Sequence, residues 1–372
     1  MISMGETKLT DNEISAAVEV MKSGNLRQAA KCAAFEEAFA DKVGAKYAVT
    51  TSNGSSSLHL YYMSELQPED EVIVPAWTFI STATMPLLHG VKPLLCDVDP
   101  ETFLIDLDYA ETIITEKTKA ICPVHLFGNV CDIDRVKAFA EKHGLKILWD
   151  AAQCHGGEYN GKDVGSYGHA VSYSFYPSKN MFVGEGGMVC TNDETLANRL
   201  KSLRQHGSTK KYHHEMIGNN YRMTDVEAAI GLEQLKRLDD MLTIRRRNKR
   251  ILDEVLIDVP GINIQKQTPG TTHAVHLYCL TIDQEDYGIT RDQLIDVLNA
   301  HDIQSAIHYP FGLHKQPVFE DMFGKQTLPG CEKLTGRIIA IPVHHGLKES
   351  QIRNVAETIK SAPKKIESLK AA

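Results

Sequence analysis

Long hydrophobic runs are missing from this sequence of 372 residues. No apolar stretch approaches the roughly 18 residues that a membrane-spanning helix needs, so we expect no membrane span. Basic residues are not in excess either, because 40 Lys and Arg stand against 48 Asp and Glu. The formal net charge of -8 argues against a nucleic-acid binder that works through a basic face.

The eight cysteines include no C-x-x-C pair and several lie inside apolar runs, as buried free thiols do. The polar stretch at residues 1–13 lacks the apolar core of a signal peptide. Together these features lead us to expect a cytoplasmic protein with reduced thiols.

Familiar site motifs are also absent. We find no G-x-x-x-x-G-K-[ST] phosphate loop and no G-x-G-x-x-G after a strand. His213-His214 and His344-His345 are adjacent pairs, whose side chains would not face each other on a helix, so we predict no metal site. His125 and His155 could touch a ligand, but histidines with satisfied hydrogen bonds are at least as common. The run Arg245-Arg246-Arg247 is interpreted as the solvated face of a long helix.

Short apolar runs alternate with amphipathic stretches between about residues 45 and 205. The runs are rich in Val, Ile and aromatic residues, and we predict strands at residues 47–51, 71–75, 93–98, 119–124, 145–149, 170–176 and 187–191. Strands that alternate with helices indicate crossover connections and a mostly parallel sheet. Such sheets place ligands at the carboxyl ends of their strands, so the residues after each strand are the candidates for chemistry.

A long helix is predicted beyond the T-x-x-E capping box of Thr224 and Glu227, with near-helical apolar spacing to about Leu256. Pro260-Gly261 then breaks the pattern. The remainder is predicted as an α+β unit with strands at residues 276–282 and 303–309 and helices at residues 291–300 and 349–361. We therefore predict a large domain, residues 1–256, and a small C-terminal domain, residues 257–372.

Three predicted strand ends carry groups that suit one site. Residues 51–58 open a helix, where free N–H groups and hydroxyls suit a phosphate, although a plain N-capped turn has the same sequence. Asp150 ends an apolar strand and could pair with a protonated pyridine nitrogen or cap a helix. Lys179 follows a strand and a proline; a lysine in a pocket can lose its proton and form an imine, but most lysines are exposed. The order of the three favours a common site.

The same residues resemble the sugar aminotransferases of the DegT/StrS-like family. Asp-Ala-Ala-Gln, Ser-Phe-x-x-x-Lys and Gly-x-Asn-x-Arg occur together only in that group, and the similarity spans nearly the whole chain. It is carried by residues 52–60, 75–82, 119–128, 150–157, 174–187 and 218–229. The resemblance implies the α/β architecture of fold-type I transferases that use pyridoxal phosphate (PLP), with a mostly parallel seven-stranded sheet in the large domain, a smaller α+β domain and a homodimer.

The resemblance implies a role for each matching residue. Lys179 would hold PLP as a Schiff base and later move a proton. Asp150 would pair with the pyridine nitrogen, Gln153 would contact the phenolic oxygen, and Trp77 would stack on the ring.

Other matching positions imply contacts with the phosphate and the substrate. Gly54, Ser55 and Ser174 would hold the phosphate, and Asn220 would reach the phosphate of the neighbouring subunit's cofactor. The segment that lies near the substrate in this family matches His308, Tyr309 and His314.

The implied reaction moves an amino group from an amino acid, expected to be L-glutamate, to a keto-sugar, expected to be nucleotide-linked, with ping-pong kinetics. A keto-cyclitol is the alternative acceptor. A PLP-dependent sugar dehydratase is the alternative reaction: such relatives can carry His at the position of Lys179, while some that keep the lysine use an iron-sulfur partner. A regulatory protein that only senses PLP or a sugar is a third possibility, but the set of Asp150, Gln153 and Lys179 argues against it, because a sensor would not need a proton shuttle.

The sequence departs from the family pattern at two places. Trp149 stands where the family often has an acidic residue, and residues 26–30 lack the Gly-Pro often found there, which concerns the identity of the substrate rather than the chemistry.

Overall fold

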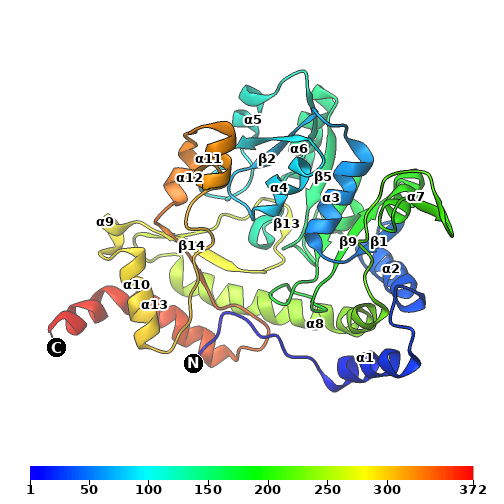
Figure 1. Ribbon diagram of the computed structural model, residues 1–372. Coiled ribbons are helices and arrows are strands. Elements are labelled where there is room, and N and C mark those ends of the chain that lie inside the picture. Colours follow the sequence, from blue (N-terminus) through cyan, green and yellow to red (C-terminus); the bar gives the residue numbers. More distant parts are fainter. Residues whose placement is uncertain (372) are drawn as a thin grey trace.

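A computed structural model describes residues 1–371, with side chains through Ile366. Its centre is a seven-stranded sheet in the order β1-β9-β8-β5-β4-β2-β3 (Figure 1). The strands are β1 (Tyr47–Thr51), β2 (Glu71–Pro75), β3 (Lys92–Cys96), β4 (Thr118–Ile121), β5 (Lys146–Asp150), β8 (Ala170–Ser174) and β9 (Gly187–Thr191). Pairing is parallel except for β9, which runs antiparallel to β1 and β8. The predicted mostly parallel sheet is confirmed, with small shifts at the strand ends.

Helices flank this sheet, so its strands are buried on both faces and read as continuous apolar runs rather than alternating ones. Every residue of β2, β8 and β9 is buried. The flanking helices are α2 (Ala30–Val43), α3 (Gly54–Glu65), α4 (Ser81–Leu87), α5 (Leu107–Ile113), α6 (Ile133–His143) and α7 (Glu194–Leu203), whereas α1 (Asp11–Ser23) packs against the long helix at residues 225–256. Short elements between them are η1 (Leu126–Gly128), β6 (Glu158–Tyr159), β7 (Lys162–Asp163), η2 (Val164–Ser166), β10 (Ser208–Lys210) and β11 (His213–His214).

Helix α6 shows how local sequence sets an element. The side chain of Asp132 accepts a hydrogen bond from the backbone N–H of Arg135 at 3.0 Å and caps the first turn. Val136, Phe139 and Ala140 recur at helical spacing and are buried. Gly144 ends the helix in the left-handed region, with φ 64°, where glycine carries no steric penalty.

The long helix α8 (Asp225–Leu256) confirms the predicted capping box and length. The backbone N–H of Thr224 donates to the carboxylate of Glu227 at 2.8 Å, and the N–H of Glu227 donates back to the Thr224 hydroxyl at 3.4 Å. Its first half packs into the core of the large sheet, and its second half packs into a separate hydrophobic cluster. The boundary at residue 256 stays a prediction, because this one helix contributes buried side chains to both clusters.

The second cluster surrounds a three-stranded antiparallel sheet, β12 (Ile262–Ile264), β14 (Tyr278–Ile282) and β15 (Ile338–Ile341). The other elements of this part are β13 (Thr271–Thr272), α9 (Gln284–Tyr287), α10 (Arg291–Ala300), η3 (Leu313–Lys315), α11 (Pro317–Phe323), α12 (Pro329–Leu334) and α13 (Glu349–Ala371). The strand predicted at residues 303–309 is wrong. That segment makes only isolated bridges, from Ile303 to Ile2 and from Ala306 to Ala340, so no continuous ladder forms.

The interpretation of the arginine run as a solvated face is also wrong. Arg245 is buried and donates to the backbone carbonyls of Val275 and His276 at 3.1 and 3.3 Å. Arg246 and Arg247 donate to further carbonyls, those of His273, Gly156 and Leu347. The three side chains donate hydrogen bonds to backbone carbonyls in irregular segments, where no neighbouring strand supplies a donor.

None of the described helices has the length and apolar content that a bilayer crossing needs.

A carboxylate from α8 caps α2 across a long sequence separation. Asp225 is buried and accepts hydrogen bonds from the backbone N–H groups of Ala29, Lys31 and Cys32 at 2.7, 3.1 and 3.1 Å. The N-cap of α2, Ala29, has no side chain that could do this. Asp225 therefore satisfies three N–H groups at the start of α2 that have no partner within that helix.

We expect Asp225→Ala to lower the free energy of unfolding by about 2–4 kcal/mol, because three backbone N–H groups, that of Cys32 buried, lose a charged acceptor. Urea denaturation followed by circular dichroism measures the loss. The matched control is Asp193→Ala, since Asp193 is the local N-cap of α7 and its loss should cost about 1 kcal/mol. Equal losses in the two variants would contradict the long-range cap.

A second carboxylate makes stability depend on pH. Burial raises the pKa of Asp163 to about 7, although hydrogen bonds from the Gly165 N–H and the Tyr173 hydroxyl, at 2.8 and 3.2 Å, oppose the shift. Between about pH 4 and pH 7, the folded chain therefore holds a proton on Asp163 that the unfolded chain, with a pKa near 3.9, has already released. This contribution to stability is complete below about pH 4 and is lost as the pH rises through about 7.

Asp163→Asn keeps an acceptor at this position without a titrating proton. We expect its thermal midpoint, relative to the parent chain, to be higher at pH 8 than at pH 5, by several degrees. Thermal unfolding of both chains at both pH values tests this. A difference between the chains that is the same at pH 5 and pH 8 would show that Asp163 does not carry the effect.

Candidate active site

Asp150 ends β5 at the carboxyl edge of the parallel strands and is buried. Its two carboxylate oxygens accept hydrogen bonds from the Ala152 N–H and from the Thr82 hydroxyl, both at 3.0 Å. Burial raises the pKa of Asp150, and these two hydrogen bonds together with the charge of Lys179 oppose that rise. The acid is therefore held rigidly, with its charge close to that of Lys179.

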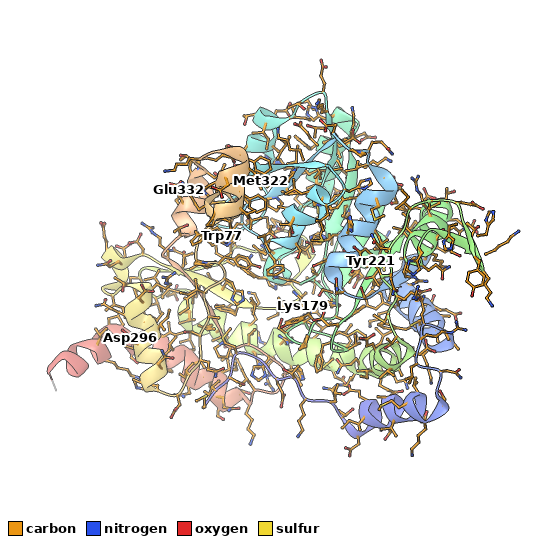
Figure 2. All side chains as sticks on the ribbon, viewed as in Figure 1. Trp77, Lys179, Tyr221, Asp296, Met322 and Glu332 are labelled. Carbon is orange, nitrogen blue, oxygen red and sulfur yellow. The ribbon has the colours of Figure 1, made fainter. Side chains whose placement is uncertain are left out.

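Lys179 lies in the turn that follows β8, between the sheet and α8 (Figure 2). The turn is closed by backbone hydrogen bonds from Phe175 to Gly186 at 2.8 Å and from Val183 to Phe175 at 3.0 Å. Part of the lysine surface stays accessible, but burial lowers its pKa to about 8, and the nearby Asp150 opposes the shift. Lys179 is therefore partly buried rather than an ordinary exposed lysine, and burial favours the neutral form of its amine.

The predicted phosphate residues are brought together where α3 begins. Asn53 caps this helix by accepting a hydrogen bond from the Ser56 N–H at 2.8 Å. The backbone of Gly54 approaches Ser174 so closely that an added Cβ would lie 2.7 Å from the Cβ of Ser174. The hydroxyl of Ser55 is 2.8 Å from that of Ser81. Hydroxyls and free N–H groups at a helix N-terminus form a cradle for an anionic group.

Trp77 and Gln153 contact Tyr309, which belongs to the segment that was predicted to lie near the substrate. Trp77 is fully buried, and its ring centroid is 6.4 Å from that of Tyr309. Gln153 accepts a hydrogen bond from the Phe127 N–H at 2.7 Å. Burial raises the pKa of Tyr309, and a hydrogen bond with the Gln153 side chain opposes the rise. Leu313 donates to the carbonyl of Ala76 at 2.7 Å, which fixes this segment beside Trp77.

The two histidines of that segment have different surroundings. His308 packs edge-on against Phe127, with 6.4 Å between the two ring centroids. Burial and the charge of Lys179 lower the pKa of His308. His314 is buried, and its Nε2 lies 3.9 Å from the carboxylate of Glu332 on α12. In Figure 2, Trp77 lies between Glu332 and Lys179. The charge of Lys179 thus contributes to the lowered pKa of His308 but not to that of His314.

Asn220 is exposed on the loop before α8. Its neighbour Tyr221 accepts a hydrogen bond from the Ser52 N–H at 2.8 Å, and the Tyr221 hydroxyl is 2.8 Å from Nδ1 of His59 (Figure 2). The loop is therefore fixed beside the cradle of its own chain. The amide of Asn220 is at the surface rather than inside this site.

Several site residues were missed from the sequence. Thr82 lies 68 positions from Asp150, and no local pattern connects the two. Asn180 donates to the carbonyl of Ala274 at 2.7 Å and fixes the backbone next to Lys179. For His155, neither ring nitrogen has a hydrogen-bond partner among the described residues. For His125, Nδ1 accepts a hydrogen bond from the Cys131 N–H at 3.0 Å.

The donor set fits PLP. Gly54 lets the start of α3 pass directly against Ser174, because an added Cβ would collide with that side chain, and the hydroxyls and free N–H groups brought together there suit a phosphate. Asp150 supplies a buried carboxylate for a pyridine nitrogen, Lys179 supplies an amine for an aldehyde, and the buried indole N–H of Trp77 has no partner in the described chain. The residues present therefore match each functional group of PLP.

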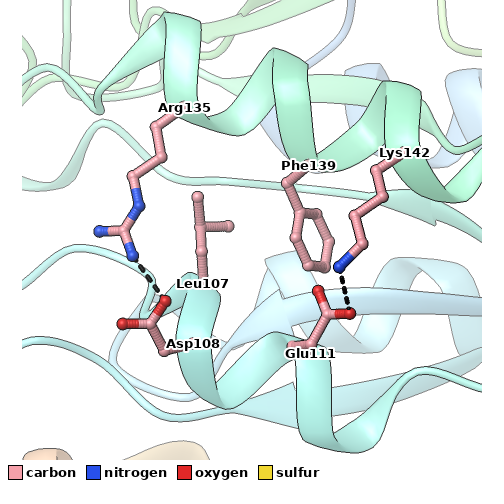
Figure 3. A pocket seen from close by; sticks show the side chains of 6 residues that line it. All are labelled: Leu107, Asp108, Glu111, Arg135, Phe139 and Lys142. Atoms are coloured by element: carbon pink, nitrogen blue, oxygen red, sulfur yellow. Dashed lines mark hydrogen bonds and ion pairs between the residues drawn. The ribbon is translucent and has the colours of Figure 1, made fainter.

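A separate hollow of about 320 Å³ lies between α5 and α6 (Figure 3). Its charges are already paired, Arg135 with Asp108 at 2.7 Å and Lys142 with Glu111 at 2.6 Å. None of its lining residues belongs to the predicted site. In the part of the chain that the structure describes, no group of three His, Cys, Asp or Glu side chains could hold a metal ion.

Comparison with known proteins gives matches over almost the whole chain. A sequence model of the DegT/DnrJ/EryC1/StrS aminotransferase family matches residues 7–360. A pleiotropic regulatory protein of Geobacillus stearothermophilus is 39% identical over 322 residues, which cover 85% of this chain and 84% of that protein. A GDP-perosamine synthase of Caulobacter vibrioides is 36% identical over 361 residues, which cover 95% and 96%.

Solved structures agree. The crystal structure of S. venezuelae DesV in complex with a ketimine intermediate has a TM-score of 0.92 at 30% identity and covers 97% of this chain and 98% of that one. Spr1654 from Streptococcus pneumoniae, solved in its PLP form, has a TM-score of 0.91 at 26% identity with 98% and 99% covered. The fold-type I architecture predicted from the sequence is confirmed.

The close approach of Gly54 to Ser174 leads to a prediction. We expect Gly54→Ala to displace Ser174 and to weaken PLP binding about tenfold to a hundredfold, since a misplaced hydrogen-bond donor costs roughly 1.4–2.7 kcal/mol. Fluorescence titration of the cofactor-free chain with PLP measures the affinity. Gly5→Ala is the matched control, because nothing lies within 4 Å of a Cβ at Gly5. Equal affinity in the two variants would argue against this cradle.

Proposed function

The chain belongs to the DegT/DnrJ/EryC1/StrS family of PLP-dependent sugar aminotransferases, and we propose that it transfers an amino group from L-glutamate to a nucleotide-linked keto-sugar. The observation that carries the proposal is the placement of Lys179, in the turn after β8, beside the buried carboxylate of Asp150 at the end of the neighbouring strand β5. Burial lowers the pKa of Lys179 to about 8. An amine that is partly neutral near physiological pH is what imine formation and proton transfer require.

Each residue of the site has a proposed task. Bound PLP would supply an aldehyde and a protonated ring that withdraws electrons. Lys179 would hold the aldehyde group through Nζ and, when its amine is free, would hold and move a proton at Nζ. Asp150 would face the pyridine nitrogen, Gln153 would contact the phenolic oxygen, and Trp77 would cover a face of the ring.

The phosphate cradle is proposed to consist of Gly54, Ser55 and Ser174, which lie at the start of α3 and the end of β8. Asn220 is proposed to complete the phosphate site of a neighbouring subunit in a homodimer. Its exposure at the surface supports this arrangement, because an amide that lies outside its own site is available to a second copy. On this proposal a monomer would bind PLP less tightly.

The substrate is proposed by analogy with the relatives. The name of the Caulobacter protein refers to GDP-perosamine, which is a nucleotide-linked amino sugar. His308 and Tyr309, which flank the lysine and Gln153, are the proposed contacts with the sugar. His314, whose Nε2 lies 3.9 Å from the carboxylate of Glu332, is proposed as a further residue of the substrate segment. A keto-cyclitol remains the alternative acceptor.

The test is spectroscopic. We expect the PLP-loaded protein to show a visible absorbance band that L-glutamate bleaches and that a keto-sugar nucleotide restores. Screening keto-sugar nucleotides against keto-cyclitols identifies the acceptor. A band that persists with every amino donor would contradict transamination, and recovery by cyclitols alone would redirect the substrate assignment.

Lys179→Ala is expected to lower the rate of glutamate-driven bleaching at least a thousandfold, in the upper range of losses for a general acid–base group, about 10²–10⁴. Lys360→Ala, which changes an exposed residue on α13, is the matched control.

The same variant, Lys179→Ala, also tests a regulatory role in the cell, because one relative is named as a regulatory protein. Cellular function that survives Lys179→Ala would favour a non-enzymatic, regulatory role.

A further inference from the structure

We propose that Thr78 and Thr82 are positioning residues that form a hydroxyl relay, in which Thr78 donates to Thr82 and Thr82 donates to Asp150. The relay holds the carboxylate in one orientation and favours its charged form. This inference rests on the proposed function, because it concerns the acid that would face the pyridine nitrogen. It assigns a task to two buried hydroxyls that are not among the residues predicted to hold PLP.

The Thr82 hydroxyl contacts Asp150 where water is excluded. Oγ1 of Thr82 donates to Oδ2 of Asp150 at 3.0 Å, and the backbone N–H of Ala152 donates to Oδ1 at 3.0 Å. The side chains of Thr82 and Asp150 are only 1% and 4% exposed. Each carboxylate oxygen thus has a fixed donor and keeps acceptor capacity for a further partner.

The direction of both hydrogen bonds in the relay follows from the number of protons. A carboxylate can only accept, so the single hydroxyl proton of Thr82 goes to Asp150. Oγ1 of Thr78 lies 3.1 Å from Oγ1 of Thr82, and the proton between them must therefore come from Thr78. Thr78 is buried as well. Hydrogen bonds in series polarise one another, so the donation from Thr78 strengthens the bond between Thr82 and Asp150.

The backbone that carries the two threonines is anchored at both ends. The N–H of Ala76 donates to the carbonyl of Cys96 at 2.8 Å, where β3 ends, and the carbonyl of Ala76 accepts from Leu313 at 2.7 Å. At the other end, the hydroxyl of Ser81 is 2.8 Å from that of Ser55 in the phosphate cradle. These contacts hold the intervening turn in place, and both threonine hydroxyls with it.

The electrostatics of the site call for such donors. Burial raises the pKa of Asp150, and its two hydrogen bonds and the charge of Lys179 oppose the rise. Three further neighbours are weak acids whose pKa is raised by burial and, among other causes, by the charge of this carboxylate: Tyr62, Cys122 and Tyr309. They stay neutral near pH 7 and cannot balance that charge. The fixed donors therefore share the stabilisation of the carboxylate with Lys179.

The experiment measures the pKa of Asp150 in the full-length, cofactor-free chain by NMR titration of aspartate labelled with ¹³C at Cγ, with the signal assigned through Asp150→Asn. We expect Thr82→Val to raise that pKa by about one unit, because the charged form loses a donor. Thr78→Val should raise it by about 0.3 unit, since a hydrogen bond strengthens the next one in series by roughly 10–30%. Thr82→Ser keeps the hydroxyl and should leave the pKa close to that of the parent chain.

A double variant tests whether Thr78 acts through Thr82. In a chain that already carries Thr82→Val, the change Thr78→Val should add nothing, whereas two independent effects would add. The matched control is Thr84→Val on the same helix α4, because the Thr84 hydroxyl donates to the carbonyl of Ile80 at 3.2 Å and belongs to a separate hydrogen bond. This control should leave the pKa of Asp150 unchanged.

Three results would overturn the relay: an unchanged Asp150 pKa in Thr82→Val, an equal shift in Thr84→Val, or shifts that add in the double variant. Should Thr82→Val not fold, Thr82→Ala replaces it in every comparison, because it also removes the hydroxyl and adds no volume. In PLP-loaded protein, glutamate-driven bleaching should slow about tenfold in Thr82→Val, since one unit of pKa corresponds to a tenfold change in rate.

The relay and the proposed function fail separately. An Asp150 pKa that does not respond, in protein that still transfers amino groups to a keto-sugar, refutes only the role of the two threonines. A pKa that shifts as expected, in protein that binds PLP but never transfers an amino group, refutes the proposed function and leaves the positioning of Asp150 in place.

Discussion

The structure depends on placing an amine and a carboxylate together at the buried end of a parallel sheet. Strands β5 and β8 are adjacent and parallel, with Asp150 opposite Ser172, so the ends of both strands meet at one edge. Burial alone disfavours the charged form of each group, which lowers the pKa of Lys179 and raises that of Asp150. Their mutual attraction opposes both shifts. The balance leaves a lysine that can be neutral beside an acid that can be charged.

Close backbone contacts surround this pair and leave little freedom. Gly54 presses against Ser174, and an added Cβ at Gly187 would lie 2.4 Å from the carbonyl of Asn53. Strand β9, the antiparallel member, therefore packs directly against the start of α3. The phosphate cradle and the lysine turn are two ends of one tightly packed unit, in which small changes of volume displace functional atoms.

Helix α8 ties this unit to the rest of the chain. Its first residue, Asp225, caps α2, and its arginines bind the carbonyls of the segment that carries His276. The same segment reaches Asn180, next to Lys179. One helix thus links the capping of α2, the packing of the second hydrophobic cluster and the backbone on both sides of the lysine.

The sequence by itself determined the strands of the large sheet, the capping box and extent of α8, and the candidates Lys179 and Asp150, because runs of buried apolar residues, caps and strand-end polar residues are local patterns. It misread residues 303–309 and the arginines of α8. Only the tertiary structure decided these, since strand pairing and the burial of a charge are set by contacts between distant segments. The hydrogen bond from Thr82 to Asp150 belongs to the same class, and no local spacing could have revealed it.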